Sequence, residues 1–506
     1  MSIAASIREN AKYYPDKTAV FCDGRAISYQ ELEDTTNCMA QWMHQKERKA
    51  GNGYSKAAVL LPNSPEFLEI VLGTAKAGWM VVTLDPKWSS EEITAVLKQT
   101  EPDYLFLDST YDAYFSEWQK VTRIISLHVG VKEVPTDERP WDAAENIDVP
   151  LSEELPMSLF YMGFTSGSTG MPKGFIRTQQ SWMTSFQEGD RELKIRRLDK
   201  VVVPGPLVHS LFLFAALHTL HAGAVCYIES SFQAERLLER CRQESITVMY
   251  GVPTMYEALG QIVEREHSQN MPLYKCIISG DRCSPAALEK LRSLFPGAEW
   301  MSFYGSSELS FVAICKGEDV MKRTSALGYP FSTVEFSIRD ERGREVQPGE
   351  AGELFVKSPM VFSGYEHEPF PVPKKWIPSG DIVREEKDGL LCLVGRRKNK
   401  IISGGLNIFP EEVETLLNSH PSVKETAVTG LTDEYWGEIA AACIEPSSGV
   451  RTETLHLELK HYCRKYTASY KCPKQWVMIE EMPLTTSGKP ARKKAAALIK
   501  KKGVKI

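Results

Sequence analysis

The sequence lacks the features that mark membrane, secreted and zinc-binding proteins. No apolar stretch approaches the length of a membrane span, and the first seventeen residues carry charges and tyrosines where a signal peptide needs an apolar core. The eleven cysteines are scattered and never form a Cys-x-x-Cys pair, so we expect reduced core thiols, with neither a disulfide framework nor a zinc site. These absences favour a cytoplasmic protein without an integral membrane segment.

A strong charge of either sign is also missing. The formal net charge of −6 does not indicate a protein that binds nucleic acid. Basic residues gather only at the end, where the stretch from Lys489 to Ile506 holds eight Lys or Arg and no acid. Such a run is compatible with a membrane or polyphosphate contact, although a solvated helix end is the favoured interpretation. The charge distribution therefore gives no indication of a nucleic-acid partner.

The order of apolar segments predicts an α/β fold. The 506 residues are too many for one compact core, so two or more domains are expected. Strand-like runs such as "AAVLLP", "YLFLD" and "ITVMYGVP" alternate with helix-like segments, which predicts layers with largely parallel sheets. Beyond Gly328, short strands and turn signals predict a β-rich subdomain that reaches about residue 395. Residues 396–506 carry the signals of a small α+β domain.

One loop stands out for its flexibility and its hydroxyl groups. The stretch "FTSGSTGMPKG", Phe164 to Gly174, has Gly, Ser or Thr at seven of eleven positions. A linker has this composition too. However, the loop follows a buried-strand pattern, and ligands of α/β folds lie at the carboxyl ends of strands. Successive backbone N–H groups, hydroxyls and Lys173 favour a phosphate cradle. A Walker loop is excluded because Pro172 precedes Lys173 and no hydroxyl follows it.

Further segments combine glycine, hydroxyl and acidic residues. They are "SFYGSSE" from Ser302, "PSGD" ending at Asp381, "VGRRKNKIISGGLNIFPEEVE" from Val394 and "PLTTSGKPARK" from Pro483. Each is weak alone, but their order and spacing over essentially the whole chain resemble the adenylate-forming superfamily of acyl-CoA synthetases, nonribosomal adenylation domains and luciferases. The phosphate loop of that family reads TSG[ST]TGxPKG, and this chain matches it throughout.

The resemblance implies an acid–thiol ligase. In this chemistry a carboxylate attacks the α-phosphate of ATP, pyrophosphate leaves, and a thiol, usually that of coenzyme A, captures the acyl adenylate. ATP, Mg²⁺ and coenzyme A are therefore the expected cosubstrates and cofactor. The resemblance also implies a large α/β adenylation domain, residues 1–395, followed by a mobile C-terminal domain, residues 396–506, with its hinge at Lys398.

The resemblance also assigns roles to individual residues. Tyr304 stacks on adenine beside Gly305, Ser307 meets the α-phosphate, and Glu308 binds Mg²⁺. The β- and γ-phosphates are surrounded by Thr165, Ser166, Gly167, Ser168, Thr169, Gly170 and Lys173. Asp381 accepts hydrogen bonds from the ribose hydroxyls, and Arg396 assists in binding them. Lys489, in the C-terminal "GK" motif, reaches the α-phosphate and the bridging oxygen as charge develops.

The identity of the acid is left open. Amino-acid adenylation domains carry an Asp in an "FDxS" segment, whereas this chain reads "PGPLVHSLFLF" at that place, so an aminoacyl substrate is disfavoured. His209 matches the His or aromatic residue between the acyl pocket and the nucleotide. An aliphatic acid and an aromatic acid both stay possible. Asp281 and Arg282, in "SGDRCSP", border either the nucleotide or the acyl pocket.

The acceptor thiol is expected to be that of coenzyme A. Ser403, Gly404 and Gly405, in "SGGLN", resemble the stretch that lines the pantetheine tunnel of the family. A carrier-protein phosphopantetheine arm is the alternative acceptor because it ends in the same group. A catalytically inactive nucleotide-binding homologue is disfavoured, since Glu308 and Lys489 are both present. The sequence leaves open whether the chain forms a homodimer.

Overall fold

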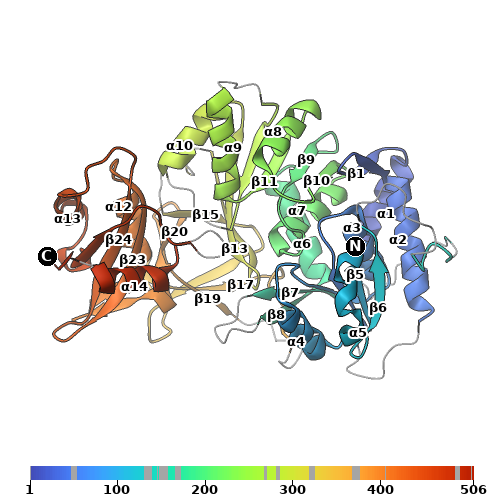
Figure 1. Ribbon diagram of the computed structural model, residues 1–506, viewed down its shortest axis with the longest axis horizontal. Helices are drawn as coiled ribbons and strands as arrows, with labels where there is room; N and C mark the ends of the chain where they lie inside the picture. Colours follow the sequence, from blue (N-terminus) through green and yellow to red (C-terminus); the bar gives the residue numbers. More distant parts are fainter. Residues whose placement is uncertain are drawn as a thin grey trace.

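The computed structural model describes residues 2–46, 54–129, 139–144, 146, 158–165, 172–266, 271–280, 285–317, 319, 325–366, 376–404, 406–484, 490–502 and 504–505. Within these ranges, no helix combines the length and the apolar character needed to cross a membrane. The chain forms three sheets with helices packed on their faces, and the last sheet forms a separate body at one end of the molecule (Figure 1).

A seven-stranded sheet carries both ends of the glycine-rich loop. Its strand order is β18 (Gly364–Tyr365), β8 (Lys173–Thr178), β7 (Leu159–Thr165), β4 (Met80–Thr83), β3 (Lys56–Leu60), β5 (Tyr104–Asp108) and β6 (Arg123–Leu127). The strands from β7 to β6 are parallel, whereas β8 and β18 join antiparallel. Because both faces are covered by helices, β4 and β5 are buried along their whole lengths.

A second, larger sheet runs through the middle of the molecule. Its strand order is β16 (Glu335–Arg339), β17 (Ala351–Lys357), β19 (Ile377–Glu385), β20 (Leu391–Arg396), β15 (Ala326–Pro330), β14 (Ser310–Lys316), β13 (Glu299–Ser306), β12 (Lys275–Ile278), β11 (Val248–Gly251), β9 (Lys200–Val203), β10 (Val225–Ile228), β1 (Thr18–Cys22) and β2 (Arg25–Ser28). The pairs from β13 to β1 are parallel, and the remaining pairs are antiparallel. The β-rich region predicted beyond Gly328 is thus mostly an antiparallel extension of this sheet.

The main core lies where the two sheets face the same helices. It draws on α1 (Ile3–Tyr13), α2 (Tyr29–His44), α3 (Pro65–Lys76), α6 (Gln179–Glu192) and α7 (Ser210–His221). All twelve residues of α3 are buried, and this helix begins where Ser64 accepts a hydrogen bond from the backbone of Phe67. The outer face of the seven-stranded sheet packs on α4 (Ser90–Thr100) and α5 (Phe115–Trp118). The outer face of the larger sheet packs on α8 (Ala234–Gln243), α9 (Pro253–Glu266) and α10 (Pro285–Leu294).

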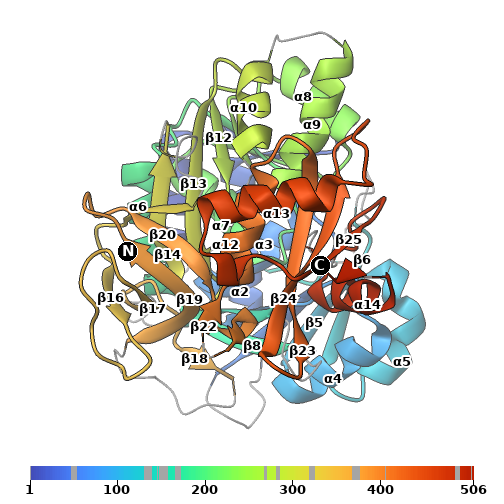
Figure 2. The same ribbon diagram turned by 90° about the vertical axis from the view of Figure 1, so that its left-hand side faces the viewer.

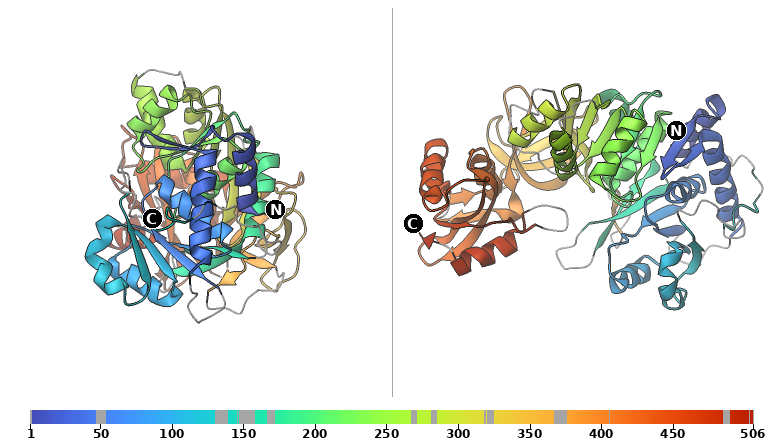
Figure 3. Two further views of the ribbon diagram at one scale, coloured as in Figure 1. Left: turned by 90° about the vertical axis from the view of Figure 1, so that its right-hand side faces the viewer. Right: turned by 45° about the horizontal axis from the view of Figure 1, so that its top comes forward.

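The C-terminal sheet has its own two cores. Its strands are β22 (Leu406–Ile408), β21 (Ile401–Ser403), β24 (Gly437–Pro446), β25 (Gln475–Met478) and β26 (Val504–Lys505), with β23 (Val423–Asp433) also paired to β24. One face packs on α12 (Pro410–Asn418) and α13 (Leu455–Tyr466), and the other packs on α14 (Arg492–Lys502) (Figure 2). The right-hand view of Figure 3 shows this body beside the β-rich end of the larger sheet. The connection runs through the short 3-10 helix η3 (Arg397–Asn399).

Candidate active site

The two ends of the glycine-rich loop are held by a strand pair. Thr165 ends β7 and lies opposite Lys173, which begins β8, in an antiparallel register. The loop therefore leaves the parallel part of the sheet at a carboxyl end, where α/β folds bind ligands. The other predicted phosphate contacts, Ser166, Gly167, Ser168, Thr169 and Gly170, lie outside the described residues.

Asp381 connects two of the predicted nucleotide contacts. It lies opposite Arg396 in the β19–β20 register, and Oδ1 of Asp381 is 3.3 Å from Nε of Arg396. The other carboxylate oxygen, Oδ2, accepts a 2.5 Å hydrogen bond from the hydroxyl of Tyr304. Burial, reinforced by the charge of Asp381, raises the pKa of Tyr304 well above its ordinary value, so the phenol stays protonated and donates. The sequence motifs that predicted these three residues are far apart, and the sheet brings them together.

The turn after Tyr304 depends on a glycine. A Cβ atom on Gly305 would lie 1.8 Å from the carbonyl oxygen of Ser310, a distance that no side chain can occupy. The register of β13 and β14 shifts at this point, and Ser306 accepts a hydrogen bond from the backbone of Leu309. This tight turn presents Ser307 and Glu308, which are both partly exposed.

Tyr365 contacts both Glu308 and Lys173. The Tyr365 hydroxyl donates a 3.0 Å hydrogen bond to Oε1 of Glu308, and Nζ of Lys173 lies 5.8 Å from the centroid of the Tyr365 ring. The structure therefore brings the predicted metal ligand close to the predicted phosphate lysine. No group of three or more His, Cys, Asp or Glu side chains suited to a metal occurs in the described part of the chain. A single carboxylate fits Mg²⁺, which is held by one or two carboxylates together with substrate phosphates.

His209 lies at the first turn of α7. It is the residue before the helix, its side chain is 55% exposed, and its Nε2 lies 3.9 Å from Oδ2 of Asp85. Asp85 lies in none of the sequence motifs, although it follows the apolar run of β4, in the way that site residues follow strands. Further along α7, Ala215 and Ala216 are fully buried in the main core.

The predicted coenzyme A segment ends strand β21. Gly404 has a φ of +56°, and a Cβ atom there would lie 2.6 Å from the ring of Trp436. Both the backbone conformation and the indole contact thus require glycine. The Nζ atom of Lys474 is 3.8 Å from the centroid of the same indole ring. Gly405, Lys489, Asp281 and Arg282 lie outside the described residues. Lys398 is exposed in the middle of η3.

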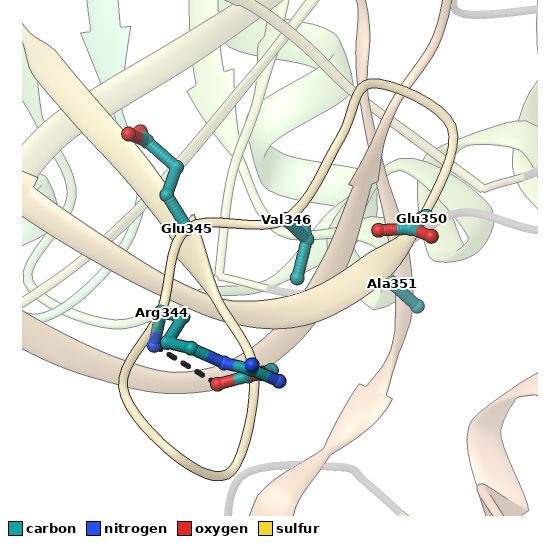
Figure 4. Close-up of a pocket in the computed structure, with 6 residues that line it drawn as sticks. Arg344, Glu345, Val346, Glu350 and Ala351 are labelled. Carbon is teal, nitrogen blue, oxygen red and sulfur yellow. Dashed lines mark hydrogen bonds and ion pairs between the residues drawn. The ribbon is translucent and has the colours of Figure 1, made fainter.

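A separate hollow lies away from these residues. It has a volume of about 680 Å³ and is lined by Asp340, Arg344, Glu345, Val346, Glu350 and Ala351. Figure 4 shows that it sits at the loop between β16 and β17. Its lining arginine is already paired, because Nη2 of Arg344 lies 2.8 Å from Oδ2 of Asp340. None of the predicted site residues contributes to this hollow.

Comparison with known proteins identifies the family. Residues 7–366 match the AMP-binding enzyme family, and residues 412–489 match the AMP-binding enzyme C-terminal domain. The chain belongs to the AMP-binding enzyme family. Its match to a Bacillus subtilis (strain 168) uncharacterized acyl-CoA ligase, YhfT, is 37% identical over 97% of both chains. A feruloyl-CoA synthase of Amycolatopsis sp is 30% identical over 95% of both chains.

A solved structure of a CoA synthetase has the same fold. It is the o-succinylbenzoate CoA synthetase of Bacillus subtilis in complex with its acyl-adenylate intermediate. That structure has a TM-score of 0.80 and 25% identity, and the alignment covers 97% of both chains. The α/β fold class and the resemblance to the adenylate-forming superfamily are therefore confirmed. The roles of the individual residues stay predictions.

Proposed function

We propose that this AMP-binding enzyme acts on an aliphatic or aromatic carboxylic acid. The chain is an AMP-forming acid–thiol ligase that activates its acid with ATP to an acyl adenylate and then transfers the acyl group to coenzyme A. Of these two classes of substrate, the relative named feruloyl-CoA synthase supports an aromatic acid. A location in the cytoplasm, where ATP and coenzyme A are available, is part of the proposal.

The observation that carries the assignment is the pairing of two clusters at one turn. Tyr304 donates a hydrogen bond to Asp381. Four residues later, Glu308 accepts a hydrogen bond from Tyr365, whose ring lies next to the ammonium of Lys173. The first cluster supplies an aromatic ring and a buried carboxylate, which suit adenine and the ribose hydroxyls. The second supplies a cation and a carboxylate, which suit phosphates and a metal ion. A nucleotide that spans this turn would have its α-phosphate near Ser307.

The remaining residues complete the proposed reaction. Lys173, Thr165 and the glycine-rich loop hold the β- and γ-phosphates, so that charge on the departing pyrophosphate is neutralised. Glu308 holds Mg²⁺, which supplies positive charge to the phosphate oxygens when it is bound. His209 separates the acyl group from the nucleotide, and Lys489 contacts the α-phosphate during adenylation. Ser403 and Gly404 line the path of the coenzyme A thiol in the second half-reaction.

The test is ATP–pyrophosphate exchange with a panel of aliphatic and aromatic acids. We expect exchange with at least one acid and AMP release that depends on added coenzyme A. The Asp381→Asn variant is the control, because at ATP concentrations below the KM it should weaken exchange for every acid alike. Absence of exchange with all acids would contradict the proposal. AMP release that needs a carrier protein in place of coenzyme A would identify that protein as the acceptor.

A further inference from the structure

Tyr365 belongs to a short segment that joins the two halves of the proposed nucleotide site. In this segment the backbone N–H of Phe362 donates to the carbonyl oxygen of Glu308 at 2.7 Å. Three residues later, β18 pairs with β8, with Tyr365 opposite Phe175. The segment is thus fixed at one end to the turn that holds Glu308 and at the other end to the strand that begins with Lys173.

The side chain of Tyr365 makes a second connection between Glu308 and Lys173. Its hydroxyl donates to Oε1 of Glu308 at 3.0 Å, and its ring lies 5.8 Å from the ammonium of Lys173. Phe362 packs edge-on against the same ring, with 5.0 Å between the ring centroids. Gly364, with a φ of +135°, supplies a backbone conformation that other residues rarely adopt and so sets the direction of the next side chain. Tyr365 therefore has little freedom to turn away.

The two contacts have different physical consequences. A hydroxyl that donates to one oxygen of a carboxylate restricts the rotation of that carboxylate and leaves its other oxygen for a further ligand. Among the described residues, Oε2 of Glu308 accepts no hydrogen bond and forms no ion pair. The face of a phenol ring attracts a cation, so the Lys173 ammonium is held near the carboxylate without direct neutralisation. Glu308 and Lys173 can then bind separate partners.

We propose that Tyr365 is a positioning residue for adenylation, acting through Glu308 and Lys173. Its hydroxyl orients the Glu308 carboxylate toward Mg²⁺, and its ring holds Lys173 toward the phosphates. The inference rests on the proposed function, and it adds a residue that contacts neither the acid nor the thiol. The alternative is that Tyr365 only holds β18 in the sheet, in which case its hydroxyl is dispensable.

The Tyr365→Phe variant separates these two roles. It keeps the ring, the Phe362 contact and the strand pairing, and removes only the hydroxyl. We expect the Mg²⁺ concentration for half-maximal pyrophosphate exchange to rise about three- to tenfold, as the loss of one typical intramolecular hydrogen bond predicts. The KM for the acid and the rate of acyl transfer from supplied acyl adenylate should stay unchanged. An unchanged Mg²⁺ requirement would overturn the proposal.

A double-mutant cycle tests whether the hydroxyl acts through Glu308. In a Glu308→Gln background, Tyr365→Phe should have little further effect on the Mg²⁺ requirement, because the oriented carboxylate is already gone. If Tyr365→Phe changes the Mg²⁺ requirement equally in both backgrounds, the hydroxyl does not act through Glu308. The matched variant Tyr365→Leu removes the ring as well, and we expect it to weaken ATP binding in the presence of EDTA, which Tyr365→Phe should not do.

Calorimetry keeps the inference testable without turnover. Binding of ATP is measured with excess Mg²⁺ and with EDTA, for wild type and for Tyr365→Phe. We expect the variant to lose several-fold affinity only in Mg²⁺, and equal loss in both solutions would contradict the proposal. If wild type binds Mg²⁺–ATP but exchanges no acid, the proposed function fails while the role of Tyr365 is still decided by this measurement.

Discussion

The hydroxyl of Tyr304 donates to Oδ2 of Asp381, 77 residues away, at 2.5 Å. Arg396 approaches the other oxygen of the same carboxylate at 3.3 Å, so both oxygens of Asp381 have partners before any nucleotide arrives. Ribose hydroxyls that bind Asp381 must share it with these two residues. A carboxylate can accept several hydrogen bonds, and one that is already oriented loses less conformational freedom on binding.

This arrangement predicts unequal effects of two conservative changes. Asp381→Asn removes the charge that both partners address, and we expect the KM for ATP to rise tenfold or more, since hydrogen bonds to charged groups contribute about 1.5–3 kcal/mol. Tyr304→Phe keeps the ring for stacking on adenine, and we expect a change of about threefold or less. Steady-state kinetics with ATP as the varied substrate measures both. A larger effect for Tyr304→Phe would mean that the hydroxyl itself contacts the nucleotide.

Gly305 offers a second test of the same turn. Gly305→Ala places a methyl group 1.8 Å from the Ser310 carbonyl oxygen, so the turn that presents Ser307 and Glu308 must open. We expect exchange activity to fall by more than tenfold. Gly297→Ala is the control, because nothing lies within 4 Å of a Cβ atom there. If Gly305→Ala retains wild-type exchange with a normal melting temperature, the turn does not position these two side chains.

Sequence motifs propose the nucleotide contacts, which stay predictions, but they do not show which residues support them. Motifs identified Tyr304, Asp381 and Glu308 because each lies in a short pattern of glycine, hydroxyl and acidic residues. Tyr365 and Asp85 lie outside those patterns, and each contacts a predicted site residue only through the fold. Such contacts depend on strand register between distant segments, which apolar periodicity does not determine.

Apolar residues in the sequence likewise predicted only part of the fold. Continuous apolar runs correctly predicted the parallel strands, because strands covered on both faces are apolar throughout. The sequence of α7 is equally apolar, although this segment forms a helix. In the structure Ala215 and Ala216 are completely buried among core side chains. Composition does not distinguish a helix that lines a pocket from one that fills a core.

A buried acid outside the site predicts a pH-dependent stability. Burial raises the pKa of Glu69 on α3 to about 7, although Nη1 of Arg139 lies 3.3 Å from its Oε2. The folded chain therefore holds a proton that the unfolded chain releases near pH 4.5, the ordinary value. This contribution to stability is fully present below about pH 4.5 and is lost as the pH rises to about 7.

The Glu69→Gln variant tests this contribution. Because glutamine does not titrate, the difference in unfolding free energy between wild type and variant should change by roughly 3 kcal/mol from pH 4.5 to pH 8, to the disadvantage of wild type. Chemical denaturation at several pH values measures the difference. A difference that is constant over this range would show that Glu69 is ionised in the folded chain.

Lys489 is predicted to serve only the first half-reaction. Its charge is needed while pyrophosphate leaves, so Lys489→Ala should abolish most ATP–pyrophosphate exchange and leave thioester formation from supplied acyl adenylate largely intact. Single-turnover assays of each half-reaction measure the two rates. Lys493→Ala, an exposed lysine on α14, is the control and should keep both activities. Equal loss of both half-reactions in Lys489→Ala would contradict the assigned role.

The last prediction concerns the connection between the large and small parts of the chain. Lys398 is the middle residue of η3, and the backbone on both sides is extended, with ψ of 133° at Arg396 and 128° at Lys400. Ion pairs of 2.7 Å flank the turn, from Arg397 to Glu353 and from Lys400 to Glu341. Rotation of a few dihedral angles here would reorient the whole C-terminal sheet.

The proposed reaction predicts two orientations of that sheet. We expect Lys489 to contact the phosphates during adenylation, and Ser403 and Gly404 to face the acyl adenylate when coenzyme A arrives. All three residues belong to the C-terminal part, about eighty residues apart in the sequence, so we expect a rotation of that part to exchange them between the two steps. Proline at position 398 fixes φ near −65° and disfavours the helical conformation of the residue before it, so Lys398→Pro should hold the chain in one orientation.

We expect Lys398→Pro to keep the adenylating orientation. Pyrophosphate exchange should then stay within a few-fold of wild type, while acyl transfer to coenzyme A falls by about a hundredfold or more. Lys398→Ala is the matched control, because a hinge needs backbone freedom and no particular side chain, and it should keep both activities. The reverse pattern, with transfer retained and exchange lost, would mean that proline holds the other orientation. A folded Lys398→Pro variant with both rates unchanged would show that the rotation occurs elsewhere, because a fixed φ at a true pivot must slow at least one of the two steps.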